Sequence, residues 1–185
     1  MVKLLIVRHA KTEWNKSGKI QGRSDVPLAP ESEDAARQAG EELRGEKIAA
    51  VFSSPLVRAV RTAELMTEGL GLKVKRDERL IERDFGAFEA RTYDELALDD
   101  HTRLFYALDD VEGVEPSESV FARVRSFVRE LTENYDGKTV LIVSHGVCIS
   151  YLVYALAHYV WNASAYEMKY IKNLTVARYE TGRDL

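Results

Sequence analysis

The sequence predicts an α/β fold, a three-layer αβα sandwich with a mostly parallel central sheet. Three short apolar segments, at residues 4–7, 49–53 and 140–144, lack the polar–apolar alternation of a half-exposed strand. This pattern indicates strands that are covered on both faces. Between them, apolar residues recur at helical spacing. Strands that alternate with helices are typical of a layered α/β domain.

The helices are expected in the stretches between these strands. One covers about residues 31–43. In the next, Ser54 and Pro55 are the expected N-cap and first helical residue, and the apolar face continues to Leu70. A third helix starts at residue 117 or 119, and a fourth follows the last strand.

The chain length suits one domain, and we expect residues 1–185 to form a single unit. A chain of this size buries roughly 70% of the surface that its unfolded form exposes. The stretch at about residues 99–118 contains two Asp-Asp pairs and several glutamates. It is therefore expected to be a lid or insertion and not part of the core.

Composition narrows the range of partners and locations. A formal net charge of −4 with scattered acidic residues argues against nucleic-acid binding. The apolar stretch 147–161 is short for a membrane span and is interrupted by Ser150 and His158. No leader-like segment precedes the first strand, and Cys148 is the only cysteine, so a cytoplasmic location is expected. Aromatic residues between 154 and 170 fit either a homo-oligomer interface or core packing.

Two of the predicted strands end in basic residues instead of turn residues. Arg8 and His9 directly follow the first strand, and His145 and Gly146 follow the strand at 140–144. Ligands of such sheets bind outside the carboxyl ends of the strands. The two histidines are therefore expected to be neighbours at a ligand site, although they are far apart in the sequence.

Arg58 is expected to join these groups, because it lies near the start of the helix that follows the strand at 49–53. An arginine fork and a helix amino end both suit phosphate oxygens. A neutral imidazole can attack phosphorus and carry the phosphoryl group covalently. Since nearby positive charge disfavours the imidazolium form, one histidine is a candidate nucleophile and the other a donor to the transferring oxygens.

Phosphoryl transfer to histidine also needs an acid for the departing alkoxide. Glu82 is the candidate, because it follows the apolar pair that ends the strand-like stretch at 73–81 and has Phe85 and Phe88 as aromatic neighbours. On charge alone, Asp84 or Glu89 would serve equally.

Five short motifs give the chain a family resemblance. They occur in the order RHAKTEWN at 8–15, SSPLVRAVRTAE at 53–64, LIERDFG at 80–86, PSES at 116–119 and VSHG at 143–146. In these motifs the chain resembles the histidine phosphatase superfamily, also called the phosphoglycerate mutase-like family. Each motif alone is weak, but five in family order are specific.

The resemblance implies a role for each matching residue. His9 would be the phosphorylated nucleophile, Arg8, Arg58 and His145 would complete the phosphate pocket, and Glu82 would be the proton donor. The positions expected to contact phosphate or substrate are Asn15, Gln21, Gly22 and Gly146. No metal or other cofactor is implied.

Several positions depart from the family pattern. Ala10 replaces the usual glycine after His9, and Ala29 replaces the residue that would cap the helix at 31–43. The mutase branch typically has Tyr where Phe85 stands and Lys where Tyr93 stands, groups that help to hold the phosphoglycerate carboxylate. The sequence therefore favours a phosphomonoesterase that forms phosphohistidine and acts on a small phosphorylated metabolite. The alternative is a phosphoglycerate mutase that depends on 2,3-bisphosphoglycerate as phosphoryl donor.

Two rivals from other classes are less consistent with the sequence. A zinc hydrolase could use two histidines and a glutamate, but no HExxH spacing occurs and two arginines would repel the cation. A noncatalytic module that binds phosphorylated ligands would not require His9, His145 and Glu82 together.

Overall fold

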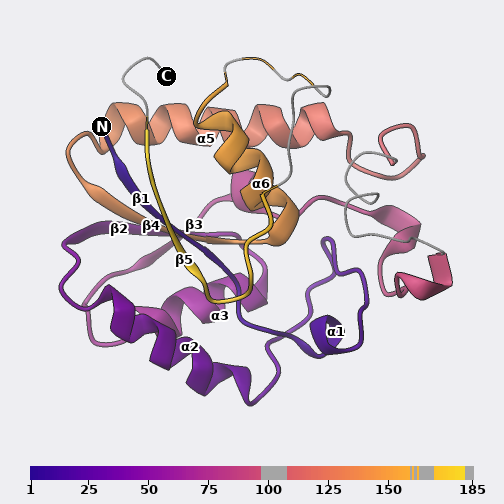
Figure 1. Cartoon of the computed structure of the whole chain (residues 1–185), viewed down its shortest axis with the longest axis horizontal. Coiled ribbons are helices and arrows are strands. Elements are labelled where there is room, and N and C mark those ends of the chain that lie inside the picture. Colours follow the sequence, from indigo (N-terminus) through magenta and orange to yellow (C-terminus); the bar gives the residue numbers. More distant parts are fainter. Residues whose placement is uncertain (97–107, 159, 161, 163–168, 182–185) are drawn as a thin grey trace.

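A mostly parallel sheet forms the centre of the molecule. The computed structural model describes residues 1–96, 108–158, 160, 162 and 169–181. Within them, five strands lie in the order β3-β2-β4-β1-β5 (Figure 1). The strands are β1 Lys3–Arg8, β2 Ile48–Ser53, β3 Val74–Arg76, β4 Thr139–Ser144 and β5 Val176–Glu180. Only β5, at the edge beside β1, runs antiparallel to its neighbour.

Helices cover both faces of this sheet. The α-helices are α1 Glu13–Lys16, α2 Ser32–Gly40, α3 Val57–Met66, α5 Ser117–Asn134 and α6 Gly146–Ala155. The 3-10 helices are η1 Glu41–Leu43, η2 Glu78–Leu80, η3 Gly86–Phe88 and η4 Asp94–Leu96. Figure 1 shows α2 and α3 on one face and α5 and α6 on the other. This arrangement confirms the three-layer α/β prediction.

Two separate apolar clusters explain why the central strands lack alternation. Leu4 and Ile6 of β1 pack in the cluster that includes α5 and α6, whereas Leu5 and Val7 pack in the cluster that includes α2 and α3. All four side chains are fully buried. Because both faces are dry, every position of the strand has to be apolar.

Two element boundaries differ from the sequence prediction. Helix α3 begins at Val57, with Leu56 extended at its N-cap, and it ends at Met66, before Leu70. Ser54 is not the cap because its hydroxyl accepts from the Leu56 N–H in a preceding turn. The expected strand at 73–81 is confined to β3, because Asp77 caps η2 and turns the chain.

Three further features of the sequence can be followed in the described part of the chain. Glu31 at the start of α2 makes no capping side-chain bond, as the replacement by Ala29 indicates. Cys148 is buried in α6, and burial raises the pKa of its thiol to about 11. None of the helices in the described residues is long and apolar enough to cross a membrane.

The predicted lid at 99–118 lies partly outside the described residues, which resume at 108. Its described end is held in place. Arg83 Nη2 donates to Asp109 Oδ1 at 2.6 Å, and Ser117 donates to the same oxygen from its backbone N–H and its hydroxyl. Since Ser117 already belongs to α5, the final two residues of the predicted lid are helical.

Candidate functional site

The carboxyl ends of β1, β2 and β4 bring the predicted residues to one edge of the sheet. The His9 N–H donates to the Ser144 carbonyl at 2.9 Å, and the Ser54 N–H donates to the Val143 carbonyl at 3.0 Å. The rings of His9 and His145 lie 5.1 Å apart, centroid to centroid. The prediction that the two histidines are neighbours in the fold is confirmed.

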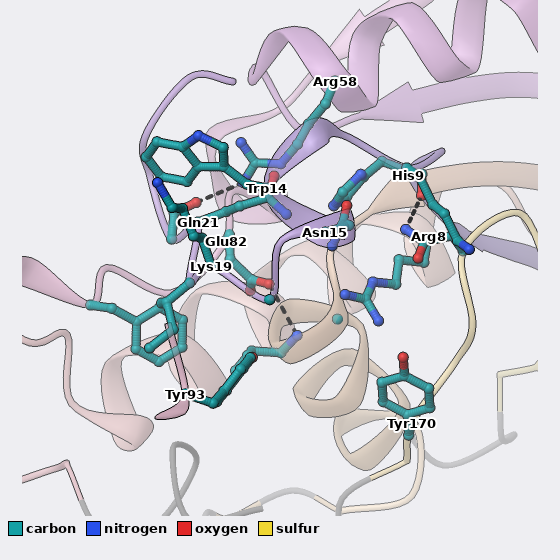
Figure 2. A pocket seen from close by; sticks show the side chains of 18 residues that line it. Arg8, His9, Trp14, Asn15, Lys19, Gln21, Arg58, Glu82, Tyr93 and Tyr170 are labelled. Atoms are coloured by element: carbon teal, nitrogen blue, oxygen red, sulfur yellow. Dashed lines mark hydrogen bonds between the residues drawn. The ribbon is translucent and has the colours of Figure 1, made fainter. Parts of the chain in front are cut away.

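A cavity of about 280 Å³ opens at this edge. Figure 2 shows Arg8, His9, Asn15 and Glu82 around its centre, with Trp14 and Tyr170 on opposite sides. Of the predicted site residues, its walls include Arg8, His9, Asn15, Gln21, Gly22, Arg58, Glu82 and Gly146. His145 does not line the cavity; it is fully buried beside His9.

His9 is held as a neutral base. Its ring is almost completely buried, and its Nδ1 lies 2.7 Å from the Ala10 carbonyl oxygen. Because a carbonyl only accepts, Nδ1 carries the proton and Nε2 keeps a free lone pair. Burial, followed by the charges of Arg58 and Arg8, lowers the pKa of His9 well below its usual value.

Arg58 is a buried guanidinium in the first turn of α3. Its Nη1 donates to the Ser24 carbonyl and its Nη2 to the Gly22 carbonyl, both at 2.7 Å, and Nε donates to His145 Nδ1 at 3.2 Å. Burial lowers the pKa of Arg58 to about 10, so the side chain stays cationic at neutral pH. The remaining N–H groups of the fork are available to an anion in the cavity.

Both ring nitrogens of His145 contact protein groups. Since Nδ1 accepts from Arg58, Nε2 carries the proton and donates to Ser54 Oγ at 2.7 Å. Burial is the main cause of the lowered pKa of His145, followed by the charges of Arg58, His9 and Arg8. In this arrangement His145 is neutral and orients Arg58.

Arg8 supplies a second guanidinium from the end of β1. Its Nε is buried and makes no hydrogen bond within the described part of the chain, and Nη1 donates to the Ile171 carbonyl at 3.4 Å. The Tyr170 ring lies 5.3 Å from Cζ, within the range of a cation–π contact. A Cβ at Gly146 would come within 3.3 Å of the same carbon, so glycine lets the guanidinium approach the amino end of α6.

Glu82 sits at the amino end of α6, where it is buried. Its Oε1 accepts from the Arg83 and Cys148 N–H groups, each at 2.9 Å, and Oε2 accepts from the Val147 N–H at 3.1 Å. The carboxylate thus satisfies free N–H groups of a helix start. Oε2 has the greater remaining capacity to exchange a proton with a ligand, because it accepts only one of these bonds.

The two other carboxylates considered as the acid lie elsewhere. Asp84 Oδ1 accepts from the Gly86 N–H at 2.8 Å, and Oδ2 lies 3.8 Å from Arg23. Glu89 accepts from backbone groups of the segment at 23–24. Neither residue lines the cavity, so Glu82 is the carboxylate positioned to contact a ligand.

Asn15 and Gln21 are oriented by one threonine. Asn15 Oδ1 accepts from the N–H of Thr12 at 3.1 Å, and Gln21 Oε1 accepts from the Thr12 hydroxyl at 2.9 Å. With both oxygens occupied, the amide nitrogens are the groups left to donate. Asn15 is also part of a capping box at α1, so it has a structural role beside any ligand contact.

The charge of the cavity suits an anion. Among the described residues, Arg8, Lys11, Lys19 and Arg58 line it, opposed by the carboxylate of Glu82 alone. This local excess of positive charge exists although the net charge of the chain is negative. Among the described residues, no three His, Cys, Asp or Glu side chains are grouped to hold a metal ion.

Sequence reasoning missed two hydroxyl groups that support the site. Ser54 faces His145, and Thr62 Oγ1 accepts from the Ala10 N–H at 3.0 Å while donating to the Arg58 carbonyl at 2.6 Å. Ser54 could have been found by the rule that identified His9, because it directly follows the carboxyl end of β2. Thr62 carries no comparable signal, since its role depends on how α3 packs against the His9 loop.

Comparison with known proteins identifies similar chains. A model of the histidine phosphatase superfamily (branch 1) matches residues 4–184. A relative named probable phosphoglycerate mutase GpmB, from Salmonella choleraesuis (strain SC-B67), is 35% identical over 158 residues, which cover 83% of this chain and 74% of the relative.

Two solved structures have the same fold. Phosphoserine phosphatase from Entamoeba histolytica, in complex with 3-phosphoglyceric acid, is 28% identical with a TM-score of 0.80, covering 96% of this chain and 90% of the other. Mycobacterial glucosyl-3-phosphoglycerate phosphatase, in complex with VO3, is 30% identical with a TM-score of 0.81, covering 95% and 91%.

The two neutral histidines predict a loss of stability in mild acid. Because the pKa values of His9 and His145 are lowered in the folded state, the unfolded chain binds more protons below about pH 6.5. The free energy of unfolding should then fall with decreasing pH, by up to about 1.4 kcal/mol per pH unit for each histidine. Urea unfolding between about pH 7 and pH 5 measures this slope.

The variant His9→Asn should lose the contribution of one histidine, so its free energy of unfolding should depend less steeply on pH. His158→Gln removes an exposed imidazole outside the cavity and controls for the loss of a histidine as such. An unchanged slope in His9→Asn would contradict the assignment of a buried neutral imidazole to His9.

Proposed function

The chain belongs to the histidine phosphatase superfamily, and we propose that it hydrolyses phosphate monoesters of small metabolites through a covalent phosphohistidine at His9. The observation that carries the proposal is the hydrogen bond from His9 Nδ1 to the Ala10 carbonyl. It leaves Nε2 as an unprotonated nucleophile in a cavity lined by two arginines and Glu82.

The first half-reaction forms the phosphoenzyme. His9 Nε2 attacks phosphorus in line as the bond from phosphorus to the ester oxygen breaks. Arg8 and Arg58 bind the phosphoryl oxygens and stabilise the charge that they carry in the transition state. The unpaired Nε–H of Arg8 and the free N–H groups of the Arg58 fork are the donors that this step uses.

Glu82 supplies the proton that the departing alkoxide needs. In the proposal, Oε2 carries this proton, since Oε1 already accepts two backbone hydrogen bonds. The alcohol then leaves with the proton, and the Glu82 carboxylate remains. In the second half-reaction the carboxylate takes a proton from water, which attacks phosphorus, breaks the bond to Nε2 and releases phosphate.

His145 acts in this scheme through Arg58. It accepts from Nε of Arg58 at Nδ1 and donates from Nε2 to the Ser54 hydroxyl. The donation to a phosphoryl oxygen that the sequence suggested for the second histidine is therefore not part of the scheme, because both ring nitrogens are engaged and the ring does not line the cavity.

The lining of the cavity favours water as the final acceptor. Phe85 and Tyr93 line it at the positions where the mutase branch typically has tyrosine and lysine. Burial raises the pKa of the Tyr93 hydroxyl, which therefore stays neutral. Neither side chain supplies the cation that would help to retain a phosphorylated carboxylate intermediate.

The second candidate, a phosphoglycerate mutase, is supported by the 35% identity to GpmB.

Covalent labelling tests the nucleophile. Wild-type protein incubated with a radiolabelled phosphate monoester and quenched during turnover should carry a label that is stable in alkali and lost in acid. His9→Ala should carry none, because it lacks the attacking nitrogen. His158→Ala is the control and should label normally. Acid-labile label on folded His9→Ala protein would exclude His9 as the phosphorylated residue.

Glu82→Gln tests the proton donor. The variant should lower kcat/KM by about 100-fold or more for an alkyl phosphate, whose alkoxide needs the proton. It should slow p-nitrophenyl phosphate only several-fold, since that leaving group departs without protonation. Asp84→Asn, in the same segment but outside the cavity, should affect neither substrate. Equal slowing of both substrates by Glu82→Gln would assign Glu82 another role.

Phosphorus NMR distinguishes phosphatase from mutase. We expect wild-type protein with 3-phosphoglycerate to release inorganic phosphate or leave the compound unchanged, with or without a trace of 2,3-bisphosphoglycerate. His9→Ala protein provides the blank. Conversion to 2-phosphoglycerate that the bisphosphate stimulates would establish the mutase and overturn the inference from Phe85 and Tyr93.

A further inference from the structure

We propose that Glu89 is a positioning residue that holds Arg58 ready for the phosphoryl group through the loop at residues 22–24. The inference rests on the proposed function, which identifies the cavity beside Arg58 as the site that binds the phosphoryl group. Glu89 lies outside the cavity and holds the loop by hydrogen bonds, and its charge also favours the cationic form of Arg58.

The Glu89 carboxylate binds the outer side of this loop. Oε1 accepts from the Arg23 N–H at 2.8 Å, and Oε2 accepts from the Ser24 N–H at 2.8 Å and from the Ser24 hydroxyl at 2.5 Å. Oε1 also accepts from the Phe85 N–H at 3.2 Å. Both oxygens must therefore be acceptors, a requirement that a carboxylate meets and an amide does not.

The carbonyl groups of the same loop face the other way. Gly22 and Ser24 present their oxygens to the two Nη atoms of Arg58, each at 2.7 Å. In the peptide unit between Gly22 and Arg23, the N–H points at Glu89 and the carbonyl at Arg58, so fixing the N–H also fixes the carbonyl, because a peptide unit is planar. The Ser24 carbonyl belongs to the next peptide unit but one, and Glu89 holds it indirectly, through the N–H and hydroxyl of Ser24.

Gly22 makes this arrangement sterically feasible. Its φ of +49° lies in the left-handed region, and a Cβ there would lie 1.9 Å from Glu89 Oε1. The contact with Glu89 thus explains why position 22 is a glycine, independently of any contact with a ligand. A glycine lets the loop pass directly over the carboxylate.

The loop also supports the helix that carries Arg58. Asp25 Oδ1 accepts from the Val57 N–H, the first of α3, at 2.7 Å. Both the helix start and the guanidinium are thereby tied to residues 22–25. If the loop shifts, the backbone and the fork of Arg58 lose their orientation together, and the binding of a phosphate dianion weakens.

The test compares Glu89→Gln with Glu46→Gln by calorimetric titration of inorganic phosphate. Glu46 is a matched control, since it is also partly buried and hydrogen-bonded, but to Lys3 at the opposite end of β1. Glu89→Gln should weaken phosphate binding at least about tenfold, because it turns one oxygen that accepts hydrogen bonds into a donor. Glu46→Gln should bind within about twofold of wild type.

A double-mutant cycle separates positioning from general destabilisation. In an Arg58→Lys background the fork is gone, so Glu89→Gln should add little further loss of phosphate affinity. With p-nitrophenyl phosphate, Glu89→Gln should raise KM more than it lowers kcat. An equal further loss in the Arg58→Lys background, or phosphate binding as tight as in Glu46→Gln, would overturn the inference.

Two further measurements keep the test decisive. Should Glu89→Gln fail to fold, Ser24→Ala removes only the hydroxyl bond and should weaken phosphate binding in the same direction by several-fold; unchanged binding would count against the proposal. Because phosphate binding is measured without turnover, the outcome is separate from the proposed activity. If the phosphate affinity of the protein depends on Glu89 but the wild-type protein hydrolyses no ester, only the proposed phosphatase function is refuted.

Discussion

The burial of Arg58 is the constraint on which the arrangement of the site depends. A guanidinium that is 1% exposed is stable only if its N–H groups are hydrogen-bonded. Its partners are two carbonyls of the loop at 22–24 and a ring nitrogen of His145, at the end of β4. One side chain of α3 therefore ties a loop and a strand end into a single unit.

The same positive charge determines the protonation of the neighbouring histidines. Burial and the two arginines lower the pKa values of His9 and His145, so both rings are neutral where an exposed histidine would be partly charged. A neutral imidazole can act as a nucleophile, and the excess of positive charge in the cavity can bind phosphate. The electrostatic conditions for binding the substrate and for attacking it are thus the same.

Strand ends made much of this site predictable from sequence. Arg8, His9 and His145 follow apolar strands, and parallel strands bring their carboxyl ends together. The sequence offers three carboxylates as the acid, because the selection of Glu82 depends on tertiary contact with the start of α6. Ser54 was misread as a helix cap because its hydroxyl serves His145, a tertiary contact that local propensity does not contain. Glu89 was considered only as an acid, since hydrogen bonds to a loop leave no sequence pattern.

The walls of the cavity are built from two kinds of structure. The arginines and histidines rest on β1, α3 and β4, whose positions the two apolar cores determine. Further lining residues, Trp14, Lys19, Tyr93 and Tyr170, lie outside the strands of the sheet. Loops accept substitutions that a packed strand does not. In the proposed function, chemistry at phosphorus is thus tied to the fold, whereas the choice of the organic part of the substrate is left to residues that can change without disturbing the core.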